Sequence, residues 1–222
     1  PPRSTLFPYT TLFRSEAVQS GATIQYHYPE QRPKNQNHLA NAVFLNPRIG
    51  LLDVVTRFNN VQVRKETARL VRVLQEIEPN LCNLSLGSQG TVYCDTGLPR
   101  LLPIACLGDG IVRLFGILLA IWDTQGGIVL IDEIENGLYH SSQKVLWNAV
   151  FKAAQEFDVQ IFATTHSMDC IKAFALSYPE VLKDGEDAAR LYRIQKNGDE
   201  FKAVDYDYPT LKSSLESDWE IR

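Results

Sequence analysis

The sequence predicts an α/β fold in which a largely parallel sheet is flanked by helices. Residues 128–131 and 159–163 are short apolar runs, and a helical segment separates them, as parallel strands require. Both runs end in polar residues, and in parallel sheets this strand end is where functional side chains gather. The composition, 45% hydrophobic and 22% charged over 222 residues, is that of an ordinary globular protein.

The bulk composition does not by itself indicate a nucleic acid or a membrane as the partner of the whole molecule. The formal net charge is −4, and the longest apolar stretch, residues 111–122, contains an arginine and is too short to span a bilayer. The four cysteines are Cys82, Cys94, Cys106 and Cys170. None forms a closely spaced pair, and no histidine lies near the first three, so we expect reduced thiols and a cytoplasmic location rather than a zinc site.

Residues 1–15 read PPRSTLFPYTTLFRS and resemble the translation of a common sequencing adapter. We expect them to be an artefactual tail, with a native disordered tail as the alternative, and exclude them from the fold. Without Arg3 and Arg14 the formal charge changes from −4 to −6. Residues 16–222 are then expected to be the C-terminal portion of one domain whose N-terminal part lies outside this sequence.

Residues 16–100 are predicted to be an intervening region of loops, one helix and short strands. Residues 16–50 are rich in Pro, Asn, Gln and His with little periodicity, which is typical of loops or extended connections. Three short apolar runs separated by turns that contain glycine predict strands at residues 81–86, 91–94 and 100–105.

One helix is predicted over residues 61–77, because its apolar residues fall on one helical face. Another face is basic and carries Arg64, Lys65, Arg69 and Arg72. This stripe could contact a phosphate backbone, but a solvated face is the favoured interpretation. Arg72 and Glu76 have the spacing of a helical ion pair, and the overall charge is acidic.

The predicted core is residues 101–176, where helices and strands alternate. Its elements are a helix from 108 to about 122, a strand at 128–131, a helix from about 141 to 157, a strand at 159–163 and a helix beginning at Ser167. Residues 177–222 form a C-terminal part of different character. An Asn-Gly pair between residues 189–195 and 200–206 predicts a β-hairpin, and a short last helix follows near residues 210–215.

The polar residues at the two strand ends match the needs of phosphoanhydride hydrolysis. Asp132 suits a Mg²⁺ ligand, and Glu133, one residue on, suits the orientation of an attacking water. His166 at the neighbouring strand end could contact the γ-phosphate of ATP. Gly108, Asp109 and Gly110 open a helix, whose N-terminal N–H groups offer an anion site.

These segments resemble the motifs of ABC-class, AAA-type ATPases of the OLD (overcoming lysogenization defect) and SMC-like branch. IVLIDE resembles a Walker B strand with its catalytic glutamate, ATTHS a switch-histidine loop and LGDGIVRLF a signature segment. Residues 135–138, Glu135-Asn136-Gly137-Leu138, lie where the D-loop follows Walker B. The order agrees as well, with 22 residues from Gly110 to Asp132 and 33 from Glu133 to His166. The resemblance covers residues 40–222.

The resemblance implies a P-loop NTPase fold and an ATP-hydrolysing enzyme that uses Mg²⁺. It implies Glu133 and His166 as catalytic residues, Asp132 as the metal ligand and the glycine segments at 108–110 and 136–137 as nucleotide contacts. Two subunits of such ATPases sandwich ATP head to tail, so a homodimer is expected. DNA or a partner effector protein is the expected coupled partner, in a DNA transaction or in defence.

The chain departs from the family pattern in several places. Gly108 replaces the usual signature serine, and Asp109 would repel a phosphate, so we expect it to cap the helix or pair with a basic group. Tyr139 precedes His140, which therefore receives no role. No G-x-x-x-x-G-K-[ST] motif occurs anywhere, so the phosphate-binding lysine is absent and these 222 residues alone are expected to be inactive.

Two alternatives stay open at this point. The chain could be the ATPase subunit of an OLD-type nuclease system in which the nuclease is a separate chain, because only 56 residues follow His166. It could instead be an interaction module without catalytic activity.

Overall fold

The computed structural model describes residues 16–20, 23–27, 41–47, 51–181, 188–197 and 200–216. The chain divides into two compact units, Pro1–Leu39 and Ala40–Arg222. In the first unit, β1 (Glu16–Ser20) and β2 (Thr23–His27) form an antiparallel pair. The segment interpreted as an adapter-derived tail lies outside the described residues.

The predicted parallel sheet is present in the second unit. It consists of β3 (Ala42–Leu45), β7 (Ile128–Ile131) and β8 (Gln160–Ala163) in the order β3-β7-β8, and both pairings are parallel. β7 has the predicted bounds, and β8 begins one residue later than predicted. The strand β3 was missed, because its four residues lie in a region whose composition indicates loops.

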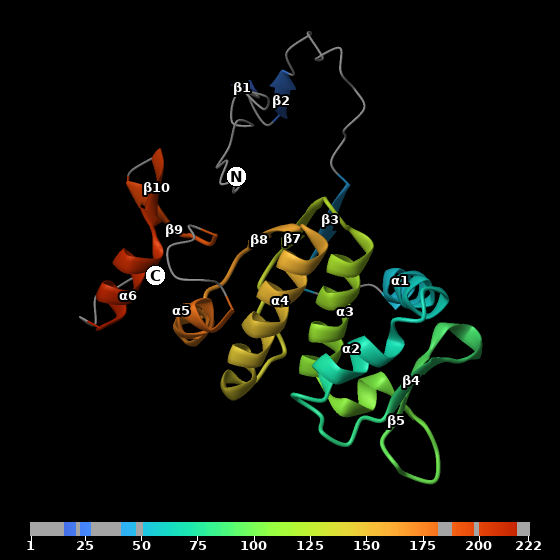
Figure 1. Ribbon diagram of the computed structural model, residues 1–222. Helices are drawn as coiled ribbons and strands as arrows, with labels where there is room; N and C mark the ends of the chain where they lie inside the picture. The colour runs from blue at the N-terminus through green and yellow to red at the C-terminus, as the bar shows by residue number, and fades with distance from the viewer. Residues whose placement is uncertain are drawn as a thin grey trace. The chain divides into compact units, whose positions relative to one another are not determined.

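One face of this sheet is buried and the other is not. Val129 and Ile131 of β7 are buried, and helices cover this face (Figure 1). On the opposite face, Phe44, Leu130 and Phe162 pair in register across the three strands and are exposed to 62%, 39% and 40%.

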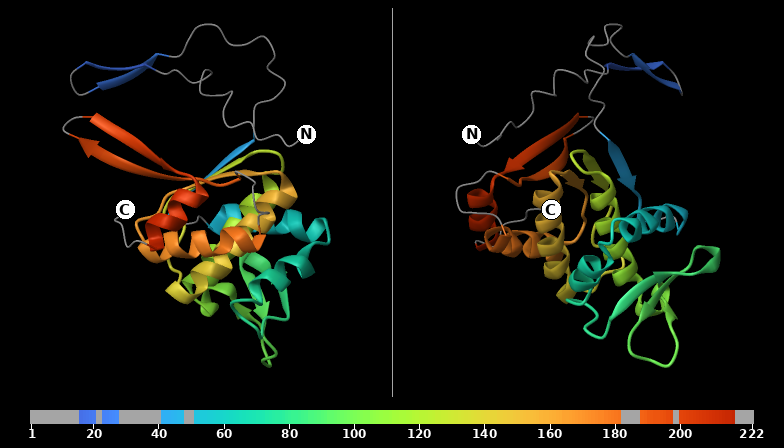
Figure 2. Two further views of the ribbon diagram at one scale, coloured as in Figure 1. Left: turned by 60° about the vertical axis from the view of Figure 1, so that its left-hand side comes forward. Right: turned by 45° about the vertical axis from the view of Figure 1, so that its right-hand side comes forward.

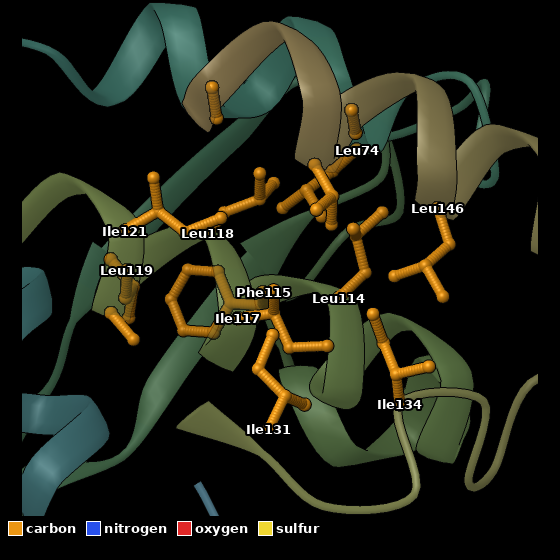
Figure 3. Packing of buried hydrophobic residues seen from close by; sticks show 14 of the residues in the cluster. Leu74, Leu114, Phe115, Ile117, Leu118, Leu119, Ile121, Ile131, Ile134 and Leu146 are labelled. Atoms are coloured by element: carbon orange, nitrogen blue, oxygen red, sulfur yellow. The ribbon is translucent and has the colours of Figure 1, made fainter. Parts of the chain in front are cut away.

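Three long helices accompany the sheet: α3 (Asp109–Asp123), α4 (Gln143–Phe157) and α5 (Met168–Val181). α3 is apolar on every side and runs through the interior, as its sequence indicates. Figure 3 shows Leu114, Phe115 and Leu118 of this helix packed with Ile131 and Ile134 from β7 and the turn after it. α4 lies beside α3 and connects β7 to β8, so the alternation of strands and helices is confirmed.

The single helix predicted over residues 61–77 is wrong, because two helices occupy the region. α1 (Leu51–Val63) and α2 (Thr67–Leu74) are separated at Lys65, which has a φ of 61°. The Lys65 N–H donates to Gln62 O, and the Glu66 N–H donates to Val61 O. These two hydrogen bonds define the Schellman motif, which ends many helices. Glycine is the residue that usually marks such an end, and its absence concealed the break.

The favoured interpretation of the basic residues, a solvated face, fits Arg64, Lys65 and Arg72, which are exposed, but Arg69 is partly buried. Arg69 makes an ion pair with Glu156 of α4, and its guanidinium lies over the rings of Trp122 and Phe157. Arg64 donates to Trp122 O at 3.4 Å. Arg69 and Arg64 are thus engaged within the protein, which weakens the interpretation that this face contacts a phosphate backbone.

The remaining predicted strands form a separate antiparallel sheet. β4 (Asn83–Leu86), β5 (Val92–Asp95) and β6 (Leu102–Pro103) pair in the order β4-β5-β6. One-turn 3-10 helices follow β4 at Ser88–Gly90 and β6 at Ile104–Leu107. A third, His140–Ser142, precedes α4.

The predicted C-terminal hairpin and helix are confirmed. β9 (Leu191–Asn197) and β10 (Glu200–Tyr206) pair antiparallel, and Figure 2 shows them as a long two-stranded ribbon. α6 (Tyr208–Glu216) follows. Asp207 caps this helix, because its Oδ1 accepts from the Thr210 N–H at 2.9 Å. None of the helices in the described ranges is both long and apolar enough to cross a membrane.

Candidate functional site

The first part of the site is the turn that ends β7. The Asp132 N–H continues the strand ladder by donating to Leu45 O of β3 at 2.9 Å. Glu133 then adopts a φ of 47°, a left-handed conformation that a glutamate rarely adopts. Strained residues of this kind persist where the surroundings hold them, and they are common at functional sites. The turn therefore directs two adjacent carboxylates away from the buried strand.

Thr164, the first residue after β8, connects this turn to the neighbouring strand. Its hydroxyl donates to Asp132 Oδ1 at 2.6 Å and accepts from the Glu133 N–H at 2.9 Å. Its main-chain oxygen accepts from the Ile134 N–H at 3.0 Å. Three bonds thus fix the strained turn against the end of β8. The structure brings the two predicted strand ends together, as the parallel sheet requires.

The loop that carries His166 is held by Glu135. Glu135 Oε1 accepts from the Thr165 hydroxyl at 2.7 Å and from the His166 N–H at 3.1 Å. His166 itself is exposed. His166 therefore lies in a loop that is hydrogen-bonded to the turn carrying Asp132 and Glu133.

Beneath the turn lies the guanidinium of Arg113, a residue of α3 that is 3% exposed. It donates to three main-chain oxygens, at 2.7 Å to Asn46, 2.5 Å to Asp132 and 3.1 Å to Glu133. Burial lowers the pKa of Arg113, while the nearby carboxylates of Asp132, Glu135 and Glu133 oppose that shift. The bonds tie the end of β3, the β7 turn and α3 into one unit.

The glycine segments at 108–110 and 136–137 also lie together. A Cβ on Gly110 would come within 3.0 Å of Gly137 O, and a Cβ on Gly137 within 3.0 Å of Asp109 Cβ. Gly108 and Gly137 have φ values of 99° and 77°, which favour glycine. The start of α3 and the turn after β7 therefore approach each other closely enough to exclude side chains.

The expectation that Asp109 caps α3 is wrong. The helix begins at Asp109 itself, Gly108 is the capping position, and no side-chain cap bond is made there. Asp109 is exposed in the first turn, where its charge interacts favourably with the helix dipole. Asn136 is exposed too, and its Nδ2 donates to Pro47 O at 3.3 Å.

The described residues contain no group of three or more His, Cys, Asp or Glu side chains able to hold a metal ion. That result fits Mg²⁺, which proteins usually bind through one or two carboxylates together with substrate phosphates and water. Asp132 offers such a carboxylate. Thr164 occupies its Oδ1, and within the described part of the chain no donor reaches Oδ2. Asp132 is thus the residue that could hold the ion.

Three residues of the site were missed from the sequence: Thr164, Glu135 and Arg113. Arg113 left a signal, because a lone arginine in an otherwise apolar helix must find acceptors. Thr164 left a weaker one, as a polar residue at the end of an apolar strand. Glu135 was placed in the D-loop segment, but nothing in the local sequence indicates its bonds to Thr165 and His166.

The family of the chain follows from a comparison with known proteins. Residues 12–169 match a family described as "AAA domain, putative AbiEii toxin, Type IV TA system". The chain belongs to this AAA family. The AAA domain is a nucleotide-binding, ATPase-type domain, so the predicted resemblance is confirmed at this level, and so is the predicted fold class.

Solved structures of SMC proteins are similar to this AAA domain at low identity. One, from "Structural biochemistry of ATP-driven dimerization and DNA stimulated activation of SMC ATPases", is 12% identical with a TM-score of 0.49, over 75% of this chain and 99% of that chain. A Smc head bound to the C-winged helix domain of ScpA is 13% identical with a TM-score of 0.49, over 75% and 51%.

A third structure is a Smc head domain with an extended coiled coil, bound to the C-terminal domain of ScpA derived from Pyrococcus furiosus. It is 13% identical with a TM-score of 0.47, over 72% of this chain and 39% of that chain. A search of curated proteins finds no match.

Proposed function

We propose that this AAA domain supplies part of an ATP-hydrolysing site. The observation that supports the proposal is the bonding of the β7 turn to the loop after β8, through Thr164 and Glu135. Hydrolysis of a phosphoanhydride depends mainly on positioning and on charge stabilisation. A rigid pair of loops that carries Asp132, Glu133 and His166 meets the first requirement.

The three side chains take different roles in this proposal. Asp132 holds Mg²⁺, which neutralises charge on the phosphates when it is bound. Glu133 orients the attacking water and accepts its proton. His166, exposed at the end of its loop, contacts the γ-phosphate and helps to align that water.

The start of α3 and the turn after β7 are proposed to face the nucleotide of a second subunit. Gly108–Gly110 present main-chain N–H groups at a helix N terminus, which favours an anion. Asn136 and Gly137 are exposed beside them. A head-to-tail homodimer would place this surface of one subunit opposite the Asp132–Glu133 turn of the other.

No G-x-x-x-x-G-K-[ST] motif occurs among these 222 residues, and we propose that the phosphate-binding loop is supplied from outside them. The lysine and the glycine-rich main chain of such a loop normally hold the β- and γ-phosphates. We therefore propose that the 222 residues do not bind ATP tightly alone. A form extended upstream to include such a loop is proposed to hydrolyse it.

The task coupled to hydrolysis is proposed from the family. Its description names a type IV toxin–antitoxin system, so a role in defence is the first candidate. A DNA transaction is the second. An OLD-type system with its nuclease on another chain would use the same ATPase site, whereas an interaction module would use none of it.

The test is ATP turnover by the extended form with Glu133→Gln. We expect turnover to be abolished and an ATP-dependent dimer to accumulate, because Gln preserves the shape of the turn but cannot accept the proton. Glu180→Gln is the matched control, since Glu180 is an exposed carboxylate at the C-terminal end of α5, where it accepts from Lys144 and Asn148. Tight ATP binding or hydrolysis by the 222 residues alone, or turnover that survives Glu133→Gln, would contradict the proposal.

A further inference from the structure

We infer that Glu135 is the positioning residue of the switch-histidine loop. The motifs place Glu135 in the D-loop segment, but neither they nor the family match connect it to the His166 loop. The inference rests on the proposed function for its catalytic consequence and on the observed contacts for everything else. Glu135 lies three residues after Asp132 in the β7 turn, while His166 lies in the loop after β8. The carboxylate therefore joins two segments that are about thirty residues apart in sequence.

A single oxygen atom makes the connection. Glu135 Oε1 accepts from the Thr165 hydroxyl at 2.7 Å and from the His166 N–H at 3.1 Å. Hydrogen bonds to an ionised carboxylate are roughly twice as strong as bonds between neutral groups. The bond to the main chain of His166 matters most, because it fixes where the side chain of His166 begins.

The Thr165 hydroxyl extends this anchor by one residue. Thr165 Oγ1 accepts from the Ser167 N–H at 3.0 Å, and it gives its own proton to Glu135. The direction of each bond is thus determined, since a main-chain N–H can only donate and an ionised carboxylate can only accept. Residues 165–167 are therefore all fixed, directly or through one hydroxyl, to the same carboxylate.

The far end of the loop is fixed to the helical layer. Ser167 Oγ accepts from the Cys170 N–H at 3.2 Å and so caps α5. Cys170 O in turn accepts from Trp147 Nε1 of α4 at 3.1 Å. The loop thus spans two anchors, a helix end that the α4–α5 packing immobilises and a carboxylate in the β7 turn. Of these two, Glu135 is the anchor that belongs to the proposed catalytic turn.

The position of Glu135 also connects the His166 loop to the proposed dimer surface. Asn136 and Gly137, the proposed contacts to a second subunit, follow immediately in sequence. A shift of this turn on dimer closure would move the His166 loop with it.

The first experiment measures hydrogen exchange at individual amides of the 222-residue chain by NMR. In Glu135→Ala we expect the His166 amide to exchange at least roughly tenfold faster, because its acceptor is lost. Glu135→Gln keeps an uncharged acceptor and should give a smaller increase. Thr165→Val should accelerate hydrogen exchange at the Ser167 amide, whereas Thr165→Ser, which keeps the hydroxyl, should not. Glu180→Gln, the control defined above, should leave the exchange of both the His166 and the Ser167 amide unchanged.

The second experiment measures kcat and KM of the extended, P-loop-containing form. Because Glu135 does not touch the nucleotide in this proposal, Glu135→Gln should lower kcat with KM for ATP unchanged. A purely structural residue would instead lower the amount of folded enzyme and leave kcat per folded molecule unchanged. Unfolding midpoints measured on the same samples separate the two cases, and Glu135→Gln keeps the test valid if Glu135→Ala does not fold.

The results distinguish the inference from the function on which it rests. Unchanged exchange at His166 in both Glu135 variants would overturn the inference. So would faster exchange with unchanged kcat, provided that Glu133→Gln abolishes turnover in the same form. If Glu133→Gln leaves turnover intact, the proposed function is wrong, and amide exchange alone still decides whether Glu135 orders the loop.

Discussion

The hydroxyl of Thr164 donates a hydrogen bond to Asp132 Oδ1 over 2.6 Å. Thr164 and Asp132 are the first residues beyond two parallel strands that pair in register, Ile131 opposite Ala163. The bond therefore directs the proposed Mg²⁺ ligand from the neighbouring strand. Because the same hydroxyl accepts from the Glu133 N–H, one side chain holds both the carboxylate of Asp132 and the main chain of Glu133.

Replacing Thr164 by valine tests this relationship. Thr164→Val keeps the shape of the side chain but removes both hydrogen bonds, so Asp132 and the strained Glu133 turn lose a common support. Misplacement of a catalytic group by about 1 Å can cost roughly 100-fold in rate, and we expect ATP turnover of the P-loop-containing form to fall by roughly 10- to 100-fold. Thr164→Ser, which restores the hydroxyl, should recover most of the rate. Equal rates for the valine variant and the wild type would show that the hydroxyl is dispensable.

Replacing Arg113 by methionine should destabilise the whole domain. Arg113→Met keeps the aliphatic stem but removes the buried guanidinium that bonds three main-chain oxygens, of Asn46, Asp132 and Glu133, in partly buried contacts. Each unpaired buried acceptor costs about 1–3 kcal/mol, so we expect the free energy of unfolding to fall by about 3–5 kcal/mol. Urea denaturation provides the measurement.

The control for that measurement is Arg72→Met. Arg72 is exposed on α2, and its Nε makes one long bond, 3.4 Å, to Ala68 O. A surface change of this kind should stay within about 0.5 kcal/mol of the wild type. A similar loss in both variants would mean that general charge removal, and not the three oxygens, is responsible.

The parts of the fold that local sequence determines were predictable. The strands that end at Ile131 and Ala163 are apolar runs followed by polar residues, and α3 is a long apolar helix opened by glycines. The break at Lys65 was not, because a lysine occupies a left-handed position that sequence patterns assign to glycine or asparagine.

The same distinction between local sequence and distant contacts applies to the residues of the site. Asp132, Glu133 and His166 occupy positions that strand ends make visible in the sequence. The roles of Arg113, Thr164 and Glu135 depend on contacts to residues 19–67 positions away, such as Arg113 to Asn46 and Thr164 to Asp132. Such contacts form only when the sheet and α3 come together, so no local pattern predicts them.

Two of the four cysteines should react with a thiol reagent in the folded chain, and two should not. Cys82 and Cys106 are exposed, whereas Cys94 and Cys170 are buried and free. Burial raises the pKa of each buried thiol to about 11, so at pH 8 almost none of it is the reactive thiolate. We expect iodoacetamide at pH 8 to modify Cys82 and Cys106 only, and all four cysteines once urea has unfolded the chain. Mass spectrometry of the intact protein measures the difference, and modification of Cys170 in the folded chain would contradict the burial described here.

The same two thiols give the stability a defined pH dependence. Burial raises their pKa from the ordinary range of a thiol to about 11 in the folded state, so folding favours the protonated thiol. The unfolded chain therefore binds fewer protons than the folded chain at pH values between the two pKa values. The contribution of Cys94 and Cys170 to stability is intact below about pH 8.5 and decreases as the pH rises towards 11.

Cys170→Ala should lower the stability at pH 7 by leaving a small cavity, but it should also make the decline between pH 9 and 11 shallower than in the wild type. Equal slopes for the two proteins over that range would show that Cys170 does not titrate with a raised pKa.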